Sequence, residues 1–240
     1  MSTTPTKPSY FAAHPGLRFD AEERTDLEAV TAVEPKLRSS RHARRHVNLQ
    51  KVVGVLGMSY VSRVHAIITN DAIRWELLRV VRCMRLPNCW IGAGFVRNAV
   101  WDHLHGRSWS PISSDVDVLW FDPDRTDPSI DQQIQTELRM LVSSVEWSVK
   151  NQARMHVHNG DAPYLSTTDA MRYWPETATA VAVRRGDGDQ CEAAAPFGLD
   201  DLFGLILRPS PKFGNEKRHL YDERVLAKGW QKIWPLLRSV

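Results

Sequence analysis

Two neighbouring stretches decide the fold: "WIGAGFVRNAVWDHLHG" at residues 90–106 and "SSDVDVLWFDPD" at residues 113–124. The first begins as a short apolar run, passes two glycines and continues with apolar residues at helical spacing. The second is an apolar segment that carries two aspartates one residue apart. A packed core requires neither the glycines nor the acids at these places. The order of strand, glycine turn, helix and acidic strand therefore indicates a site as well as a fold.

The paired acids are Asp115 and Asp117, at the start of a predicted strand over residues 115–121. Side chains alternate along a strand, so both project from one side, with Cα atoms roughly 6.5 to 7 Å apart. Their oxygens can then meet on one Mg²⁺, or on two ions that share a carboxylate. No Lys or Arg in the strand offsets their repulsion. The alternative is a solvated strand edge with ordinary turn chemistry.

The glycine turn precedes a predicted helix. Gly92 and Gly94 allow backbone N–H groups to approach a phosphate chain, and the helix N-terminus adds a partial positive charge. Arg97 lies in the first helical turn, within reach of the same anion. A close-packed strand-to-helix turn explains the glycines equally well when they are taken alone. The order of glycine turn, arginine and paired acids favours a site for a metal-bound nucleoside triphosphate.

The rest of the predicted domain contains further helices and strands. Apolar residues at helical spacing predict a helix over residues 69–84, with Thr69 or Asn70 as its N-cap, and another over 127–141. Strands are predicted at residues 145–150, 177–183 and 191–195, and helices at 198–207 and 216–237. This pattern predicts an α/β (α+β) fold with a small mixed sheet flanked by helices and a helical C-terminus.

The 240 residues divide by composition. Residues 1–68 are predicted to be a flexible leader and basic arm, and residues 69–240 the folded domain. The arm, residues 36–51, holds six Lys or Arg residues and no acid. It either lies on nucleic acid phosphates, RNA being the expected partner, or is a solvated surface segment.

The sequence shows no pattern typical of a membrane-spanning, secreted or disulfide-rich protein. No stretch approaches the roughly 18 to 20 apolar residues of a membrane helix, and no signal peptide is recognisable. The three cysteines form no C-x-x-C pair, so a reducing cytoplasm and no membrane are expected.

The pattern G-x-G-x-V-R-N, followed by a helix and D-V-D-V, resembles the head of the nucleotidyltransferase superfamily, which includes poly(A) polymerases and tRNA CCA-adding enzymes. The chain is more closely similar to the family 6 nucleotidyltransferase-like proteins of bacteria. Further segments that carry this resemblance are "VKNQARMH", "DAPYLSTTDAM", "YWPETATAVAVR", "PFGLDDLF" and "RPSPKF". Together they cover roughly residues 70–240.

The resemblance implies transfer of a nucleoside monophosphate from a nucleoside triphosphate, with Mg²⁺ or Mn²⁺ as cofactor and pyrophosphate as leaving group. It implies that Asp115 and Asp117 hold the metal and that the turn Gly92–Ala93–Gly94 and Arg97 contact the triphosphate. This sequence departs from the tRNA-modifying enzymes at Ala93, which separates the glycines, and at Asn98, which replaces an acid.

The superfamily also uses a third carboxylate on a later strand. Glu146 is the expected one, with Asp169 and Glu176 as alternatives that a salt bridge or helix cap would also explain.

The polar segment after that strand is the last expected part of the site. Lys150, Asn151 and Arg154 are expected to line the nucleotide or acceptor pocket, although a solvated surface strand is an alternative. The acceptor itself is not specified. A non-catalytic nucleotide- or RNA-binding protein on the same fold is the alternative function.

Overall fold

The computed structural model describes residues 59–112 and 115–240. The leader and the basic run at residues 36–51 lie outside the described residues. Within the described ranges, no helix combines the length and apolar character that crossing a membrane requires.

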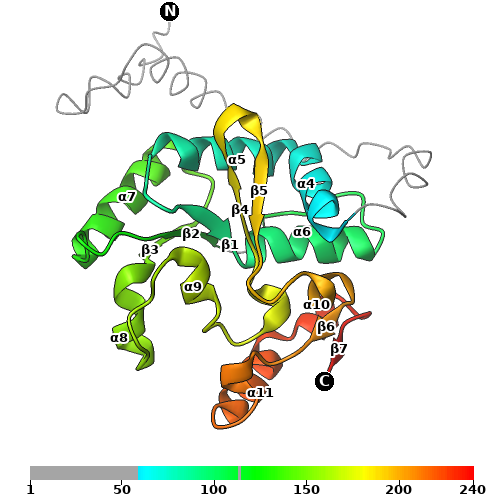
Figure 1. Cartoon of the computed structure of the whole chain (residues 1–240). Coiled ribbons are helices and arrows are strands. Elements are labelled where there is room, and N and C mark those ends of the chain that lie inside the picture. The colour runs from blue at the N-terminus through cyan, green and yellow to red at the C-terminus, as the bar shows by residue number, and fades with distance from the viewer. Residues whose placement is uncertain (1–58, 113–114) are drawn as a thin grey trace, which may run out of the picture.

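A five-stranded mixed sheet forms the centre of the molecule, with the strand order β3-β2-β1-β4-β5 (Figure 1). Strands β2 and β3 are parallel, and the other neighbouring pairs are antiparallel. The small mixed sheet predicted from the sequence is thereby confirmed. The strands are β1 (Trp90–Gly92), β2 (Val116–Trp120), β3 (Trp147–Asn151), β4 (Ala182–Arg185) and β5 (Cys191–Ala194).

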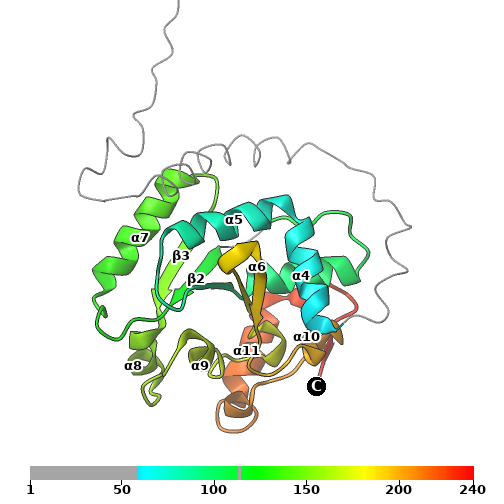
Figure 2. The ribbon, with the colours of Figure 1, turned by 45° about the horizontal axis from the view of Figure 1, so that its top comes forward.

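One face of the sheet is covered by long helices and holds the main core. Strand residues Val118, Trp120 and Trp147 point to this face and pack in one buried cluster with Leu77 and Leu138. Figures 1 and 2 both place α5 and α7 on this side. The helices that contribute to the cluster are α4 (Tyr60–Asn70), α5 (Ala72–Cys83), α6 (Gly94–Leu104) and α7 (Pro128–Leu141).

Helices from the second half of the chain lie on the other side of the sheet (Figure 1). They include α8 (Met155–Asn159), α9 (Thr167–Met171) and α11 (Arg218–Lys228). A second, smaller cluster forms on this side around Trp90, Leu119 and Met171. This face is only partly covered, and it carries the candidate site.

The folded domain begins before the expected boundary at residue 69. Helix α4 starts at Tyr60, and its Val64 and Ile68 are fully buried in the main core. The predicted cap of the next helix is corrected as well. Thr69 and Asn70 end α4, and the Asp71 side chain accepts the first N–H groups of α5. One residue therefore joins the two helices.

The C-terminal region is less helical than its sequence pattern predicts. Helix α10 (Asp200–Phe203) is short, and Leu205 follows with a φ of 55°. The next residues form β6 (Ile206–Leu207), which pairs in parallel with β7 (Arg238–Ser239). Gly229, with a φ of 57°, separates α11 from α12 (Trp230–Ile233). Pairing with the distant chain end thus replaces the end of a predicted helix.

Candidate functional site

The second aspartate of the D-x-D lies at the middle of the partly covered face. In the sheet register, Asp117 of β2 is paired with Gly92 of β1 on one side and with Ser148 of β3 on the other. The alternation of the strands adds Leu119 and Lys150 to the same face. We call this face, which carries these five residues, the site face.

Gly92 is required by close packing. A Cβ atom at this position would lie 2.7 Å from Leu119 Cδ1 and 3.2 Å from the Trp174 ring. The packing explanation for this glycine therefore holds. Gly92 itself is buried, and its place in the sheet register sets the start of the glycine turn directly beside Asp117.

Asp117 is held in an environment that disfavours a lone negative charge. Burial, and secondarily the neighbouring charge of Asp115, raise the pKa of Asp117 from 3.8 to about 6. A hydrogen bond from Ser148 and the charges of Arg97 and Lys228 act in the opposite direction. Asp115 itself is exposed, immediately before the strand. A bound cation stabilises two such carboxylates in their ionised form.

Helix α6 begins next to Asp117. Its N-cap is Ala93, with φ 53° and ψ −120°, a backbone conformation that favours glycine. The Ala93 N–H donates to the Val181 carbonyl at 2.9 Å, which holds the turn in place. No side chain caps the helix. The N-terminal N–H groups of α6 thus provide positive potential at the site face.

Arg97, in the first turn of α6, is buried with only 8% of its surface exposed. Its guanidinium lies 4.7 Å from the Trp230 ring centroid and 5.2 Å from that of Trp101, and donates to Asn98 Oδ1 at 2.9 and 3.1 Å. Burial lowers the pKa of Arg97 to about 10, although Glu176 and Asp117 oppose this shift. Arg97 therefore adds positive potential near Asp117, and its contact with a triphosphate stays a prediction.

Helix α11 brings charges to the site that the sequence pattern did not reveal. Arg224 of α11 donates to the fully buried Glu176 at 2.7 Å, and Thr179 donates to the other Glu176 oxygen at 2.8 Å. Lys228, in the last turn of α11, is exposed and acts electrostatically on Asp117. No local motif marks Arg224 or Lys228, because only the chain fold brings α11 to the sheet.

The expected third carboxylate lies at the edge of the site. The Glu146 carbonyl accepts the Val116 N–H at 2.8 Å, so the Glu146 backbone is adjacent to the D-x-D. Its side chain is 71% exposed and pairs with Arg139 at 2.7 Å. The two alternative carboxylates already accept hydrogen bonds within the fold. Glu176 accepts from Arg224 and Thr179, and Asp169 accepts from the Leu165 N–H at 3.0 Å.

No cluster of three or more His, Cys, Asp or Glu residues suited to a metal forms within residues 59–112 and 115–240. Ser148, rather than an acid, faces Asp117 on β3.

The polar residues at the end of β3 and just after it divide between the two faces. Lys150 is exposed on the site face. Asn151 points to the α7 side, where it is buried and donates to the carbonyls of Asp122 and Arg125, at 2.8 Å each. Arg154 pairs with Asp131 of α7. Asn151 and Arg154 thus hold the strand end to α7, and the structure does not bring them together with Asp117.

Comparison with known proteins agrees with this arrangement. The sequence model of a family described as nucleotidyltransferase matches residues 79–239. A solved structure, described as an NMR structure that reveals a CCA-adding enzyme head domain, is similar with 31% sequence identity and a TM-score of 0.68. The similarity covers 75% of this chain and 95% of that one. Curated protein sequences give no match. The chain is therefore a member of the nucleotidyltransferase family, with a fold similar to the CCA-adding enzyme head domain.

Proposed function

We propose that the protein is a cytoplasmic, Mg²⁺-dependent nucleotidyltransferase that transfers a nucleoside monophosphate from a nucleoside triphosphate, ATP among them, to an acceptor. The observation that carries the proposal is the pairing of Asp117 with Gly92, directly before the uncapped N-terminus of α6. This arrangement places a carboxylate beside a phosphate-binding type of backbone.

The donor set fits a hard divalent cation. Asp115 and Asp117 supply carboxylate oxygens, which Mg²⁺ and Mn²⁺ prefer. The raised pKa of Asp117 means that the surrounding residues do not by themselves compensate the carboxylate charge, which a bound divalent cation would do. When bound, the metal supplies Lewis-acid stabilisation of charge on the phosphate oxygens.

Glu146 remains the proposed third carboxylate. Its present partner is Arg139, in an exposed ion pair. Pairs of this kind contribute only about 0–1 kcal/mol, so turning the side chain towards Asp115 costs little.

The chain's own groups bind and orient the donor. The turn Gly92–Ala93–Gly94 and the N-terminal end of α6 receive the triphosphate, and Arg97 and Lys228 add positive charge. An acceptor hydroxyl then attacks the α-phosphorus in line, the bond to the bridging oxygen breaks, and pyrophosphate leaves. Positive potential fixed in advance at the triphosphate stabilises the charge that develops on this leaving group.

Incorporation of label tests the proposal. Purified protein is incubated with each α-labelled nucleoside triphosphate, Mg²⁺ or Mn²⁺, and cell RNA or lysate. The substitutions Asp115→Ala and Asp117→Ala are expected to abolish transfer, whereas Asp187→Ala, in an exposed turn, is expected to preserve it. Labelling that survives both active-site substitutions contradicts the proposal.

A non-catalytic nucleotide- or RNA-binding protein is the second candidate. The observation in its favour is Ser148, which occupies the β3 position facing Asp117. This function predicts Mg²⁺-dependent triphosphate binding without label transfer to any acceptor. If the basic run at residues 36–51 contacts RNA, its deletion should weaken binding and flatten the salt dependence.

A further inference from the structure

A cavity of about 320 Å³ opens on the site face beyond Asp117. Its floor includes Leu119 and Lys150, and its walls come from α8, the segment after α9 and the segment before α11. The volume is at the lower end of the range typical of small-molecule sites, about 300–1,000 Å³. The cavity thus has room for a single small organic group such as one nucleotide.

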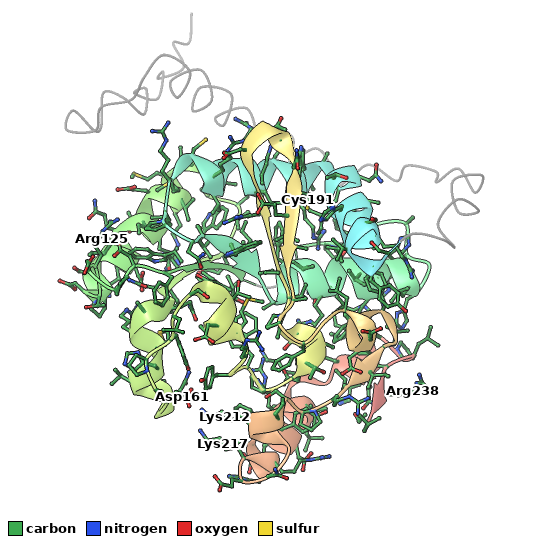
Figure 3. The ribbon with its side chains drawn as sticks, in the orientation of Figure 1. Arg125, Asp161, Cys191, Lys212, Lys217 and Arg238 are labelled. Carbon is green, nitrogen blue, oxygen red and sulfur yellow. The ribbon has the colours of Figure 1, made fainter. Side chains whose placement is uncertain are left out.

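The charge of the cavity is strongly positive. Three lysines line it, Lys150, Lys212 and Lys217, and none of the described lining residues is acidic. Asp161, outside the lining, pairs with Lys212. Lys217 Nζ donates to the Asn159 carbonyl at 3.4 Å and lies 6.0 Å from the Phe213 ring centroid. Figure 3 shows Asp161, Lys212 and Lys217 together below α8. With one carboxylate for three cations, the cavity suits a phosphate group.

Aromatic rings form the other part of the wall. Tyr173, Trp174 and Phe213 line the cavity. Lys212 Nζ lies 5.1 Å from the centroid of the Tyr173 ring, so charge and ring surface are adjacent. Stacking on such rings binds any planar base without selecting its sequence. Rings and lysines together match a base and its phosphate.

The position of the cavity indicates which substrate it receives. Leu119 and Lys150 each follow a central residue, Asp117 or Ser148, by two positions along a strand, which is roughly 6.5 to 7 Å. The α6 N-terminus, proposed for the triphosphate, instead adjoins Gly92 and Asp117. A group in the cavity is therefore beside the reacting centre and next to the proposed triphosphate position, because Leu119 and Trp174 line the cavity and also pack against Gly92.

We propose that this cavity binds a nucleotide unit of the acceptor, with its base against Trp174 and Tyr173, its phosphate at the three lysines, and a hydroxyl directed to Asp117. The assignment as acceptor rests on the proposed function, whereas the binding of a phosphorylated nucleoside does not. The source is either a free mononucleotide or the terminal nucleotide of a single strand.

Binding of adenosine monophosphate and of a mixed-sequence RNA hexamer, measured by calorimetry, tests the proposal. The donor position is first saturated with a non-hydrolysable triphosphate and Mg²⁺. The double substitution K150Q/K217Q is expected to weaken binding of both probes by roughly tenfold or more, because each loses charge-assisted hydrogen bonds. The matched control Lys232→Gln, on an exposed residue of α12, is expected to leave binding unchanged. Melting curves establish that each variant is folded.

The outcomes separate the possibilities. A hexamer that binds much more tightly than the mononucleotide identifies a strand end, and equal affinities identify a free nucleotide; either supports the proposal. Adenosine, measured in the same way, serves as the probe without phosphate. Equal binding of adenosine and its monophosphate, or unchanged affinity in the double variant, overturns the proposal. Weakened triphosphate binding in the double variant assigns the cavity to the donor and also overturns it. Failure of label transfer, with these binding results intact, refutes only the catalytic function.

Discussion

Replacing Asp117 by Asn should stabilise the metal-free protein while removing its response to Mg²⁺. Asparagine preserves the shape of the side chain and can still bond Ser148, but it carries no charge. The substitution removes the free-energy cost of holding a charged carboxylate at this position in the folded state. The size of this cost follows from the pKa of Asp117, which the fold raises from 3.8 to about 6. That difference corresponds to up to about 3 kcal/mol of unfolding free energy.

The sign of the effect depends on pH. Below the unfolded pKa of 3.8, Asp117 is protonated in both states and the folded protein bears no cost. As the pH rises, the unfolded chain releases the proton first, so the folded state loses relative stability until about pH 6. Linkage gives a gain from Asp117→Asn of about 1 kcal/mol at pH 4.5 and about 3 kcal/mol at pH 8.

Urea unfolding in EDTA at these two pH values measures the gain, with Asp187→Asn as an exposed control. Mg²⁺ added at pH 8 should then stabilise the wild type and the control but not the Asp117→Asn protein, because only a folded state that binds the ion is stabilised. A variant that is no more stable than the wild type at pH 8, or a gain of equal size at both pH values, refutes the reasoning.

Three further changes test other parts of the structure. Ala93→Gly should raise the unfolding free energy by about 1 kcal/mol, because glycine relieves the positive φ of 53°; a less stable variant in thermal melting would contradict this strain. Asp102→Ala should lower the unfolding free energy by about 3–5 kcal/mol in denaturant unfolding, because Asp102 is the buried carboxylate that accepts hydrogen bonds from Trp234 at 2.7 Å and from Arg107 at 2.6 Å. A loss below about 1 kcal/mol would argue against a stabilising role for these contacts. Lys228→Gln should weaken triphosphate binding by roughly tenfold with an unchanged melting temperature, and unaltered affinity in a titration would remove α11 from the donor position.

The central strand-turn-helix-strand unit was predictable because its signals are local. Alternation along the strand placed Asp117 beside the glycine turn, and helical spacing defined α6 and α7. The common side of Asp115 and Asp117 stays a prediction, because Asp115 lies one residue before β2. The cap of α5 was misplaced by one or two residues, because several residues that favour caps stand together and packing of α4 selects Asp71.

Two other features of the structure could not be predicted from local signals: the strand at Ile206 and the direction of the Asn151 side chain. The segment around Ile206 follows a helical pattern, yet it pairs with Arg238 and becomes a strand. Asn151 is polar and ends β3, a strand of the site, yet alternation and a set of hydrogen bonds direct it to α7. Each outcome depends on a partner distant in sequence, and local periodicity carries no information about such partners.

The amino-acid pattern thus predicts the chemistry proposed for the site, since the glycine turn and the paired acids are adjacent in the chain and obey short-range backbone geometry. Its electrostatic surroundings arise only when the chain is folded. Burial raises the pKa of Asp117, α11 brings Arg224 and Lys228 to the sheet, and three separate segments bring the lysines and aromatic rings of the cavity together. Burial and charge proximity are properties of three-dimensional packing, and residues far apart in the chain supply them.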